Sequence, residues 1–281
     1  MPGRTRAITA MALVGASLAL VGGIGCKPGP VPADQTSLVL DPGPNPGPPA
    51  RPVSLVWHHH STGQDLLDGG LLAALKADNI AFHDLNYEEA KVDGYVIGDH
   101  TDPPDFPTNF NTPKYFEVIA GWELEKGKQH EVVMFKSCFP ASAIESDQKL
   151  ADYKKWYLSL VPTFTKHPKI LFLPLSTPPL TRAETQPEHA ARARAFAKWL
   201  TTEYVKQAPN VRAFDLFNAL AILEGKEHEN TLAPQFAAAR KDSHPTPEGA
   251  KAVTRLFIPW LNRTLKDFGL GHAPAPATAR P

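Results

Sequence analysis

The sequence predicts a three-layer α/β/α domain, in which helices cover both faces of a mostly parallel, five-stranded sheet. Three observations support this. Short apolar runs of strand length alternate with longer segments of helical period along residues 53–269. Several of these runs end abruptly in polar residues, which is how open α/β sheets present reactive side chains. No unit of about 20 to 50 residues repeats, so a solenoid is excluded.

The five predicted strands are short and apolar, and they cover residues 53–57, 80–87, 131–135, 169–175 and 211–217. The predicted helices carry apolar residues at helical spacing, and they cover residues 66–75, 114–124, 150–164, 188–205 and 247–268. Thr246 is the expected N-cap of the last helix, because Pro247 suits the first helical position. Residues 88–113 are expected to form a long loop rich in Gly, Asp and Pro.

The two ends of the chain differ from the predicted domain at 53–269. Residues 27–52 are rich in proline and glycine, a composition that opposes helices and sheet ladders, so we expect a linker. Residues 270–281 form an expected loose tail. Residues 1–26 resemble an export signal, because two arginines precede an apolar run that is short for a membrane span.

Cys26 closes this run directly after Gly25, as in the lipobox of bacterial lipoproteins, although Gly23 stands where leucine is usual. We therefore predict a protein of the bacterial cell envelope that is attached to the membrane only through a lipid on Cys26. The alternative is an ordinary signal peptide and a soluble periplasmic or secreted protein. Lys and Arg together number 29, as do Asp and Glu, and this balance argues against nucleic acid as a partner. We expect a monomer.

Three polar clusters, at residues 58–63, 136–142 and 242–244, are expected at one edge of the sheet. Ser61 follows the first strand. Asp242 and His244 precede the last helix, where the imidazole can take a proton from a serine hydroxyl while the carboxylate orients it. This assignment predicts that Ser61 Oγ lies about 2.6–3.2 Å from a ring nitrogen of His244. The alternative is a helix-entry turn in which Asp242 and His244 only bond the backbone.

These motifs resemble the SGNH/GDSL hydrolase superfamily, whose members have a flavodoxin-like α/β/α fold. His60-Ser61-Thr62 stands where Gly-Asp-Ser is usual, and Asp242-Ser243-His244-Pro245 stands where Asp-x-x-His-Pro is usual. The resemblance covers about residues 53 to 266. It implies a nucleophilic Ser61, a base at His244 and an orienting carboxylate at Asp242. The Asp–His spacing is one residue shorter here, which puts their contact in question.

The oxyanion hole is the part of the resemblance that this sequence does not complete. The superfamily uses the serine amide, a glycine after the second strand and an asparagine in a Gly-x-Asn-Asp turn. That turn is missing. Gly94 or Gly98 could supply the glycine amide, and the hydroxyls of Ser137 or Ser142 could replace the asparagine. An oxyanion donor contributes roughly 3–4 kcal/mol to catalysis.

The histidine triplet at 58–60 and Cys138 offer two other chemistries. A metal site would need the triplet together with Asp242 or His244, but adjacent strand residues seldom supply a full ligand set. We expect instead that His60 lines the site and that the other two histidines are packed or bond loop carbonyls, with no metal or other cofactor. Cys138 is a second candidate nucleophile, because Lys136 beside it would favour the thiolate. The alternative is a small buried hydrophobic residue.

The expected function is an exported serine hydrolase that cleaves an ester by a Ser-His-Asp mechanism. Small-molecule esters and O-acyl groups on polysaccharides are the candidate substrates. Two alternatives stay open, namely a surface binding module with a decayed site on the same fold, and a metal-dependent hydrolase.

Overall fold

A computed structural model describes residues 43–271 of the chain. Its central sheet contains four parallel strands in the order β2-β1-β5-β6. Their bounds are Val53–His58 for β1, Ile80–Leu85 for β2, Val132–Phe135 for β5 and Leu171–Pro174 for β6. With residues 211–214 beside β6, this order matches that of flavodoxin-like sheets and confirms the predicted fold class.

The fifth strand is not formed as predicted. Residues 211 and 214 make only isolated parallel bridges, to Phe172 and Leu175. Backbone hydrogen bonds join β6 to residues 210–214, as from Phe172 N to Asn210 O and from Ser176 N to Phe214 O. The bond between them is missing, because Pro174 has no N–H to donate. The chain then turns away, because the Asp215 side chain accepts from Asn218 N and caps α8 (Leu216–Leu220).

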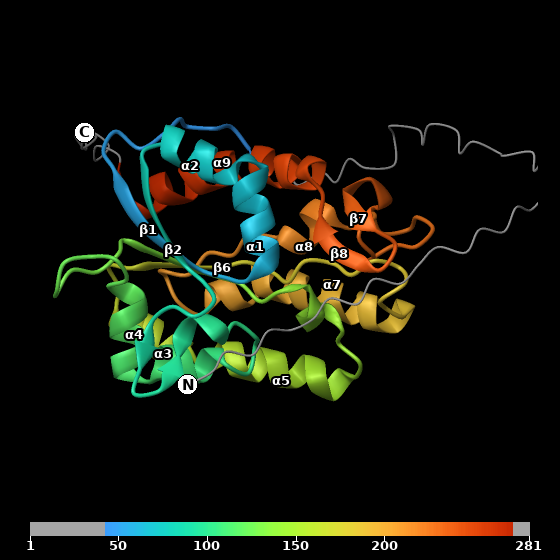
Figure 1. The fold of residues 1–281 in the computed structure, drawn as a ribbon, viewed down its shortest axis with the longest axis horizontal. Coiled ribbons are helices and arrows are strands. Elements are labelled where there is room, and N and C mark those ends of the chain that lie inside the picture. Colours follow the sequence, from blue (N-terminus) through green and yellow to red (C-terminus); the bar gives the residue numbers. More distant parts are fainter. Residues whose placement is uncertain (1–42, 272–281) are drawn as a thin grey trace, which may run out of the picture. The chain divides into compact units, whose positions relative to one another are not determined.

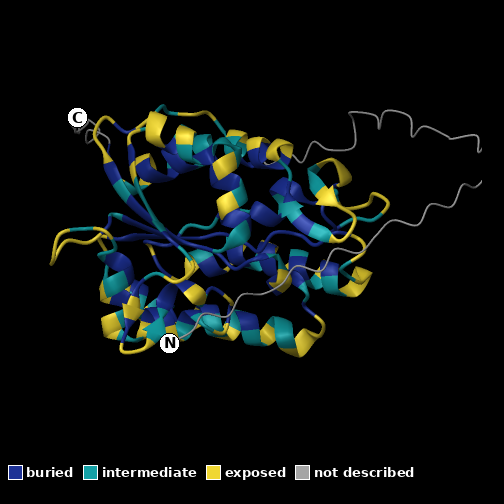
Figure 2. Cartoon of the chain, in the orientation of Figure 1, coloured by how far each residue is buried: buried dark blue, intermediate teal, exposed yellow. Residues whose placement is uncertain are grey.

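The helices form two layers, one on each face of the sheet (Figure 1). One layer contains α1 (Ser61–Leu66), α2 (Leu72–Ala77), α8 and α9 (Pro247–Phe268). The other contains α3 (Phe106–Asn111), α4 (Pro113–Ala120), α5 (Asp147–Leu158), α6 (Val161–Lys166) and α7 (Pro187–Thr202). Each layer covers its own apolar core. Strands β5 and β6 are buried on both faces, the edge strand β2 is partly exposed, and the outer sides of the helices carry many exposed residues (Figure 2).

The helix after β1 is interrupted by a wide turn at Leu67–Leu71, where Gly70 has a φ of 120°. A Cβ on neighbouring Gly69 would lie 2.1 Å from the Cβ of Ala250 in α9. Glycine therefore allows this helix and α9 to approach closely above the sheet. The predicted helix at 66–75 is, for this reason, two short helices joined by a bend.

Residues 88–113 contain more regular structure than the predicted loop. Lys91–Val92 and Tyr95–Val96 pair as the short antiparallel strands β3 and β4, and α3 follows. Asp93 and Gly94 connect the strands with φ of 50° and 86°, as in a two-residue hairpin turn. Two residues per strand are too few to give a periodic signal in the sequence.

The Asp-His motif lies on a second small hairpin, formed by β7 (Ala237–Ala239) and β8 (Asp242–Pro245). β8 leads directly into α9 and packs against α1. Thr246 is the N-cap of α9, and its hydroxyl accepts from Gly249 N at 3.2 Å, as predicted. Short 3-10 turns at Ile97–Asp99, Phe139–Ser142, Tyr204–Lys206 and Pro234–Phe236 complete the elements.

The start of the described chain contacts the domain. Ala50 N donates to Gly271 O at 2.8 Å, and Arg51 forms two hydrogen bonds with Glu131. The predicted export signal with Cys26, the linker as far as residue 42 and the tail from residue 272 lie outside the described residues. Within residues 43–271, no helix combines the length and the apolar character that a membrane span requires.

Candidate active site

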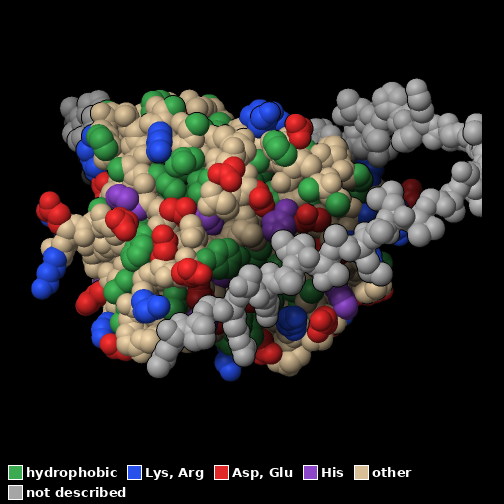
Figure 3. Space-filling view, viewed as in Figure 1, with side chains coloured by type: hydrophobic (Ala, Val, Ile, Leu, Met, Phe, Trp, Pro, Cys, Tyr) green, Lys and Arg blue, Asp and Glu red, His purple; other side chains and the backbone are tan. Residues whose placement is uncertain are grey.

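The polar turns that follow the strands meet at the carboxyl edge of the sheet. Ser61 begins α1 three residues after the end of β1, and Cys138 likewise lies three residues after the end of β5. The hairpin with Asp242 and His244 packs beside α1. Figure 3 shows histidine side chains next to acidic ones in the middle of the drawn face of the molecule.

His244 and Asp242 form the pair that the sequence predicts, despite their short spacing. The two residues point to the same side of β8, and His244 Nδ1 lies 2.6 Å from Asp242 Oδ1. The same oxygen accepts from the backbone N–H of His244 at 3.0 Å. These backbone and side-chain hydrogen bonds lower the pKa of Asp242. Since Nδ1 donates to the carboxylate, Nε2 carries the lone pair that can accept a proton.

The hydrogen bond predicted between Ser61 and His244 is not formed, and Ser61 Oγ instead lies 3.0 Å from Cys138 Sγ. His244 reaches the same cluster through Phe139, whose ring packs edge-on against the imidazole at a centroid distance of 4.8 Å. The structure thus places Cys138 in contact with Ser61, while its neighbour Phe139 contacts His244.

The histidine triplet holds the neighbouring loop in place. His58 Nε2 donates to Ile97 O at 3.0 Å, and His60 Nε2 lies 2.5 Å from Gly98 O. His59 points to the other face, where it lies 2.8 Å from the Asp84 carboxylate. Burial lowers the pKa of His58 to about 3, and burial also lowers that of His60. Within the described part of the chain, no three His, Cys, Asp or Glu side chains are grouped as a metal site would require.

The candidate oxyanion glycines do not present free amides to Ser61. Gly98 N donates to Glu89 O at 3.1 Å. A Cβ on Gly98 would lie 1.8 Å from Asn86 O, so glycine is needed there for close packing of the backbone. Gly94 lies at the tip of the β3–β4 hairpin, where a Cβ would meet no atom within 4 Å. The Ser61 amide itself lies 3.4 Å from the hydroxyl oxygen of Tyr87.

The two candidate serines of the third turn are both buried. Ser142 Oγ lies 2.7 Å from both Pro178 O and Thr177 Oγ1, so it connects this turn to the one after β6. The Ser137 hydroxyl is fully enclosed and has no hydrogen-bond partner among the described residues. Neither hydroxyl contacts Ser61, so the structure does not bring them into the site as oxyanion donors.

Cys138 and Lys136 affect each other's ionisation, which a small buried hydrophobic residue at a strand end would not do. Lys136 is fully buried, and burial lowers its pKa to about 8. Burial would raise the pKa of Cys138, but the Lys136 charge and hydrogen bonds from Ser61 and Thr62 oppose this effect, and the pKa is lowered. The cysteine is therefore an ionisable group in contact with the candidate nucleophile.

Three residues near the site were not identified from the sequence. Thr62 places its hydroxyl 3.0 Å from Cys138 Sγ. Tyr87 stacks on His60 at a centroid distance of 3.9 Å, with 49% of its surface exposed. Asp65 has a buried Oδ2 without a hydrogen-bond partner, and burial raises its pKa. Its position four residues after Ser61, on the same side of a helix, is the only signal that could have indicated it.

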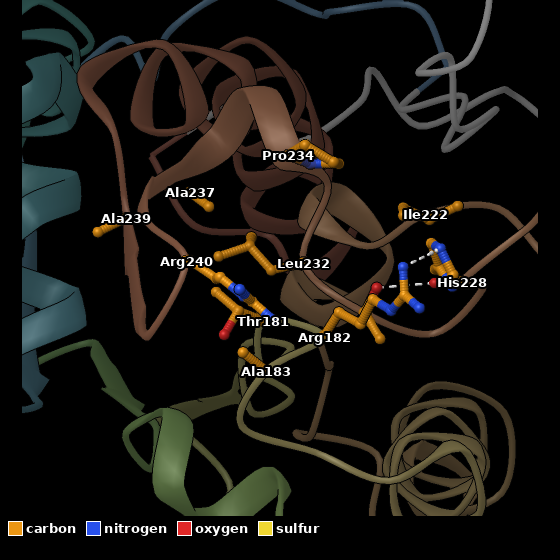
Figure 4. A pocket seen from close by; sticks show the side chains of 11 residues that line it. Thr181, Arg182, Ala183, Ile222, His228, Leu232, Pro234, Ala237, Ala239 and Arg240 are labelled. Carbon is orange, nitrogen blue, oxygen red and sulfur yellow. Dashed lines mark hydrogen bonds between the residues drawn. The ribbon is translucent and has the colours of Figure 1, made fainter. Parts of the chain in front are cut away.

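A cavity of about 610 Å³ adjoins the hairpin that carries His244 (Figure 4). Leu232 and the β7 residues Ala237 and Ala239 form part of its wall. Thr181, which also lines it, donates its amide to Ser243 Oγ at 2.8 Å. Arg182 and Arg240 add two positive charges. Ser243 points to the opposite side of β8 from Asp242 and His244, so the cavity lies behind the Asp-His pair, and neither residue lines it.

Comparisons with known proteins find only distant likeness to solved structures. No protein-family model and no curated protein matches the sequence. A GDSL-like lipase from Bacteroides thetaiotaomicron has 12% identity and a TM-score of 0.41, over 76% of this chain and 88% of the lipase. A family two carbohydrate esterase from Cellvibrio japonicus has 15% identity and a TM-score of 0.43, over 79% of this chain and 63% of the esterase.

A gut microbial diltiazem-metabolizing enzyme gives a TM-score of 0.46 at 10% identity, over 77% of this chain and 48% of that enzyme. GDSL is the superfamily that the motifs of this sequence resemble. At these identities and scores, the chemistry of the chain has to rest on its own residues.

Proposed function

We propose that this protein is a serine hydrolase that cleaves an ester. The observation that carries the proposal is the Asp242–His244 contact of 2.6 Å on a strand packed against the helix that begins at Ser61. Ser61 Oγ attacks the acyl carbonyl, and His244, oriented by Asp242, transfers protons during the reaction. Water then releases the acid, and the other product is a free hydroxyl.

The substrate fits a small ester or an O-acyl group on a saccharide. These are the substrates expected from the sequence, and the 610 Å³ cavity beside β8 is not assigned to them, because neither Ser61 nor His244 lines it. The proposal also includes export and a lipid anchor on Cys26, which rest on the sequence of residues 1–26.

The test is labelling and turnover of the Ser61→Ala variant. We expect the wild-type protein to react with a fluorophosphonate probe and to hydrolyse p-nitrophenyl acetate. Ser61→Ala should lose both, with kcat/KM at least about a thousandfold lower because the nucleophile is removed. Ser159→Ala removes an exposed hydroxyl on the opposite helical layer and should change neither result. Full activity in Ser61→Ala would refute the mechanism.

A second candidate function is a binding module on the same fold with a decayed site. Two observations favour it: Ser61 and His244 are not hydrogen-bonded, and the Gly98 amide is already bonded to Glu89 O. A wild-type protein that neither labels nor cleaves any short acyl ester, yet retains a saccharide in a binding assay, would support this candidate.

A further inference from the structure

The sulfur of Cys138 lies at the centre of the candidate site. Its Sγ is 3.0 Å from Ser61 Oγ and 3.0 Å from Thr62 Oγ1. A thiol has one proton to donate, so at least one of the two hydroxyls donates to the sulfur. A thiolate accepts from both hydroxyls, and an anionic acceptor makes such bonds shorter and stronger. Cys138 provides the only side-chain hydrogen bond to Ser61 Oγ within residues 43–271.

Lys136 supplies the charge that such a sulfur needs. The side chain is fully buried, and no carboxylate of the described chain lies within ion-pair distance of it. Its Nζ has one hydrogen bond, a long one of 3.4 Å to Ser137 O. A buried ammonium without a nearby anion is strongly destabilised, so a negative charge is expected beside it. Cys138 and Asp65 are the two groups whose charges act on Lys136.

We propose that Cys138, held as a thiolate by Lys136, is a catalytic residue that accepts the proton of Ser61 during attack on the ester. The inference rests on the proposed function. As the Ser61 Oγ–carbon bond forms, the O–H proton moves to Sγ, and the Cys138 thiol then gives that proton to the leaving alkoxide. In the second half, His244 takes a proton from the attacking water and gives it to Ser61 Oγ as the acyl group leaves.

The positions of Cys138 and His244 agree with these two proton-transfer roles. The serine contacts the sulfur directly, whereas His244 contacts Asp242, whose negative charge stabilises the imidazolium that forms when water attacks. Other charged groups also face the pair. Asp65 interacts with Lys136, His244 and Asp242, and the Lys136 charge reaches His60 as well. Burial alone would raise the pKa of Cys138, but the Lys136 charge and the hydrogen bonds with Ser61 and Thr62 lower it.

Thiol ionisation can be measured independently of any activity. We would use the full chain with Cys26→Ser, which leaves Cys138 as the single cysteine, and follow iodoacetamide alkylation and ultraviolet thiolate absorbance against pH. The expected midpoint lies below the ordinary value of about 8.5, and Lys136→Met should raise it. Lys149→Met is the matched control, because Lys149 Nζ bonds Ala143 O and does not act on Cys138.

A wild-type midpoint at or above about 8.5, or one that Lys136→Met leaves unchanged, would overturn the proposal. Lys136→Gln is a second variant if the methionine variant does not fold, as judged by circular dichroism. Because this titration needs no substrate, its failure is distinguishable from a failure of the proposed esterase activity.

Kinetics then test the proton transfer. Cys138→Ala should lower kcat/KM for p-nitrophenyl acetate by about 100- to 10,000-fold and remove the pH limb that coincides with thiol ionisation. Lys136→Met should shift that limb upwards. Unchanged activity and an unchanged pH profile in Cys138→Ala would overturn the proposal. An acyl group mapped to Cys138 instead of Ser61 would do so as well, because the cysteine would then be the nucleophile.

Discussion

His58 is a buried side chain that makes the free energy of unfolding depend on pH. It is fully buried, and Nε2–H donates to the Ile97 carbonyl. Burial lowers its pKa to about 3, so the folded protein keeps this imidazole neutral under mildly acidic conditions. The unfolded chain, with an ordinary pKa of about 6.5, binds the proton instead. Acid therefore favours the unfolded state through this residue.

We predict that the free energy of unfolding falls as pH drops from about 6.5 towards 3. At pH 5 the loss from His58 alone should be about 2 kcal/mol. Urea denaturation at pH 7 and pH 5 measures it. His58→Gln should be less stable overall but should lose this part of the pH dependence. His189→Gln, at a partly exposed site on α7, should keep it, and an equal pH slope in wild type and His58→Gln would contradict the prediction.

At the scale of elements, α9 supports the site because the Asp-His strand leads directly into it. Its first turn is fixed by Thr246, which accepts from Gly249 N, and by Pro247 at the first helical position. Gly249 itself packs against Phe236 and Pro245, where a Cβ would lie 3.2 Å from each. The start of α9 therefore sets the position of β8 and of His244.

We predict that Thr246→Ala lowers the free energy of unfolding by about 1 kcal/mol, because the N-cap bond is lost. Thr246→Ser keeps the capping hydroxyl and should restore most of that loss. Chemical denaturation of the three proteins makes the comparison. Thr254→Ala, inside α9, removes a hydroxyl that only bonds the preceding turn, so a larger loss there than at Thr246 would argue against the cap.

The elements also show what sequence periodicity can and cannot reveal. Buried strands such as β1 and β5 are continuous apolar runs, so they were predicted within two residues. The fifth predicted strand forms only isolated bridges, because Pro174 of the neighbouring strand β6 has no N–H to donate to it. The β3–β4 hairpin was missed because two-residue strands have no period.

The same reasoning applies to the site. Asp242 and His244 could be predicted because they are close in sequence and precede a capped helix. The contact of Cys138 with Ser61 joins residues 77 positions apart, and only the sheet order brings them together. The burial of Lys136 depends on both helical layers and has no local signature.

At the scale of the whole molecule, the location of the protein depends on residues 1–26. If Cys26 carries a lipid, the wild-type chain produced in a bacterium should appear in the membrane fraction and incorporate labelled palmitate. Cys26→Ser should abolish the label and prevent membrane retention. Cys138→Ser leaves the anchor residue intact and should remain in the membrane fraction. Recovery of the wild-type chain in the soluble fraction, without label, would contradict the anchor.

The hydrogen bond between Ala50 and Gly271 has a topological consequence. The two ends of the described domain meet at 2.8 Å, so a short peptide could join them into a closed ring. The exposed loop at Gly225 and Lys226 would then be a suitable place for new termini, because its side chains are solvent-facing. In such a circular permutant β8 and α9 would precede β1, so the chain order of the nucleophile and its Asp-His pair would be reversed without a change in the site.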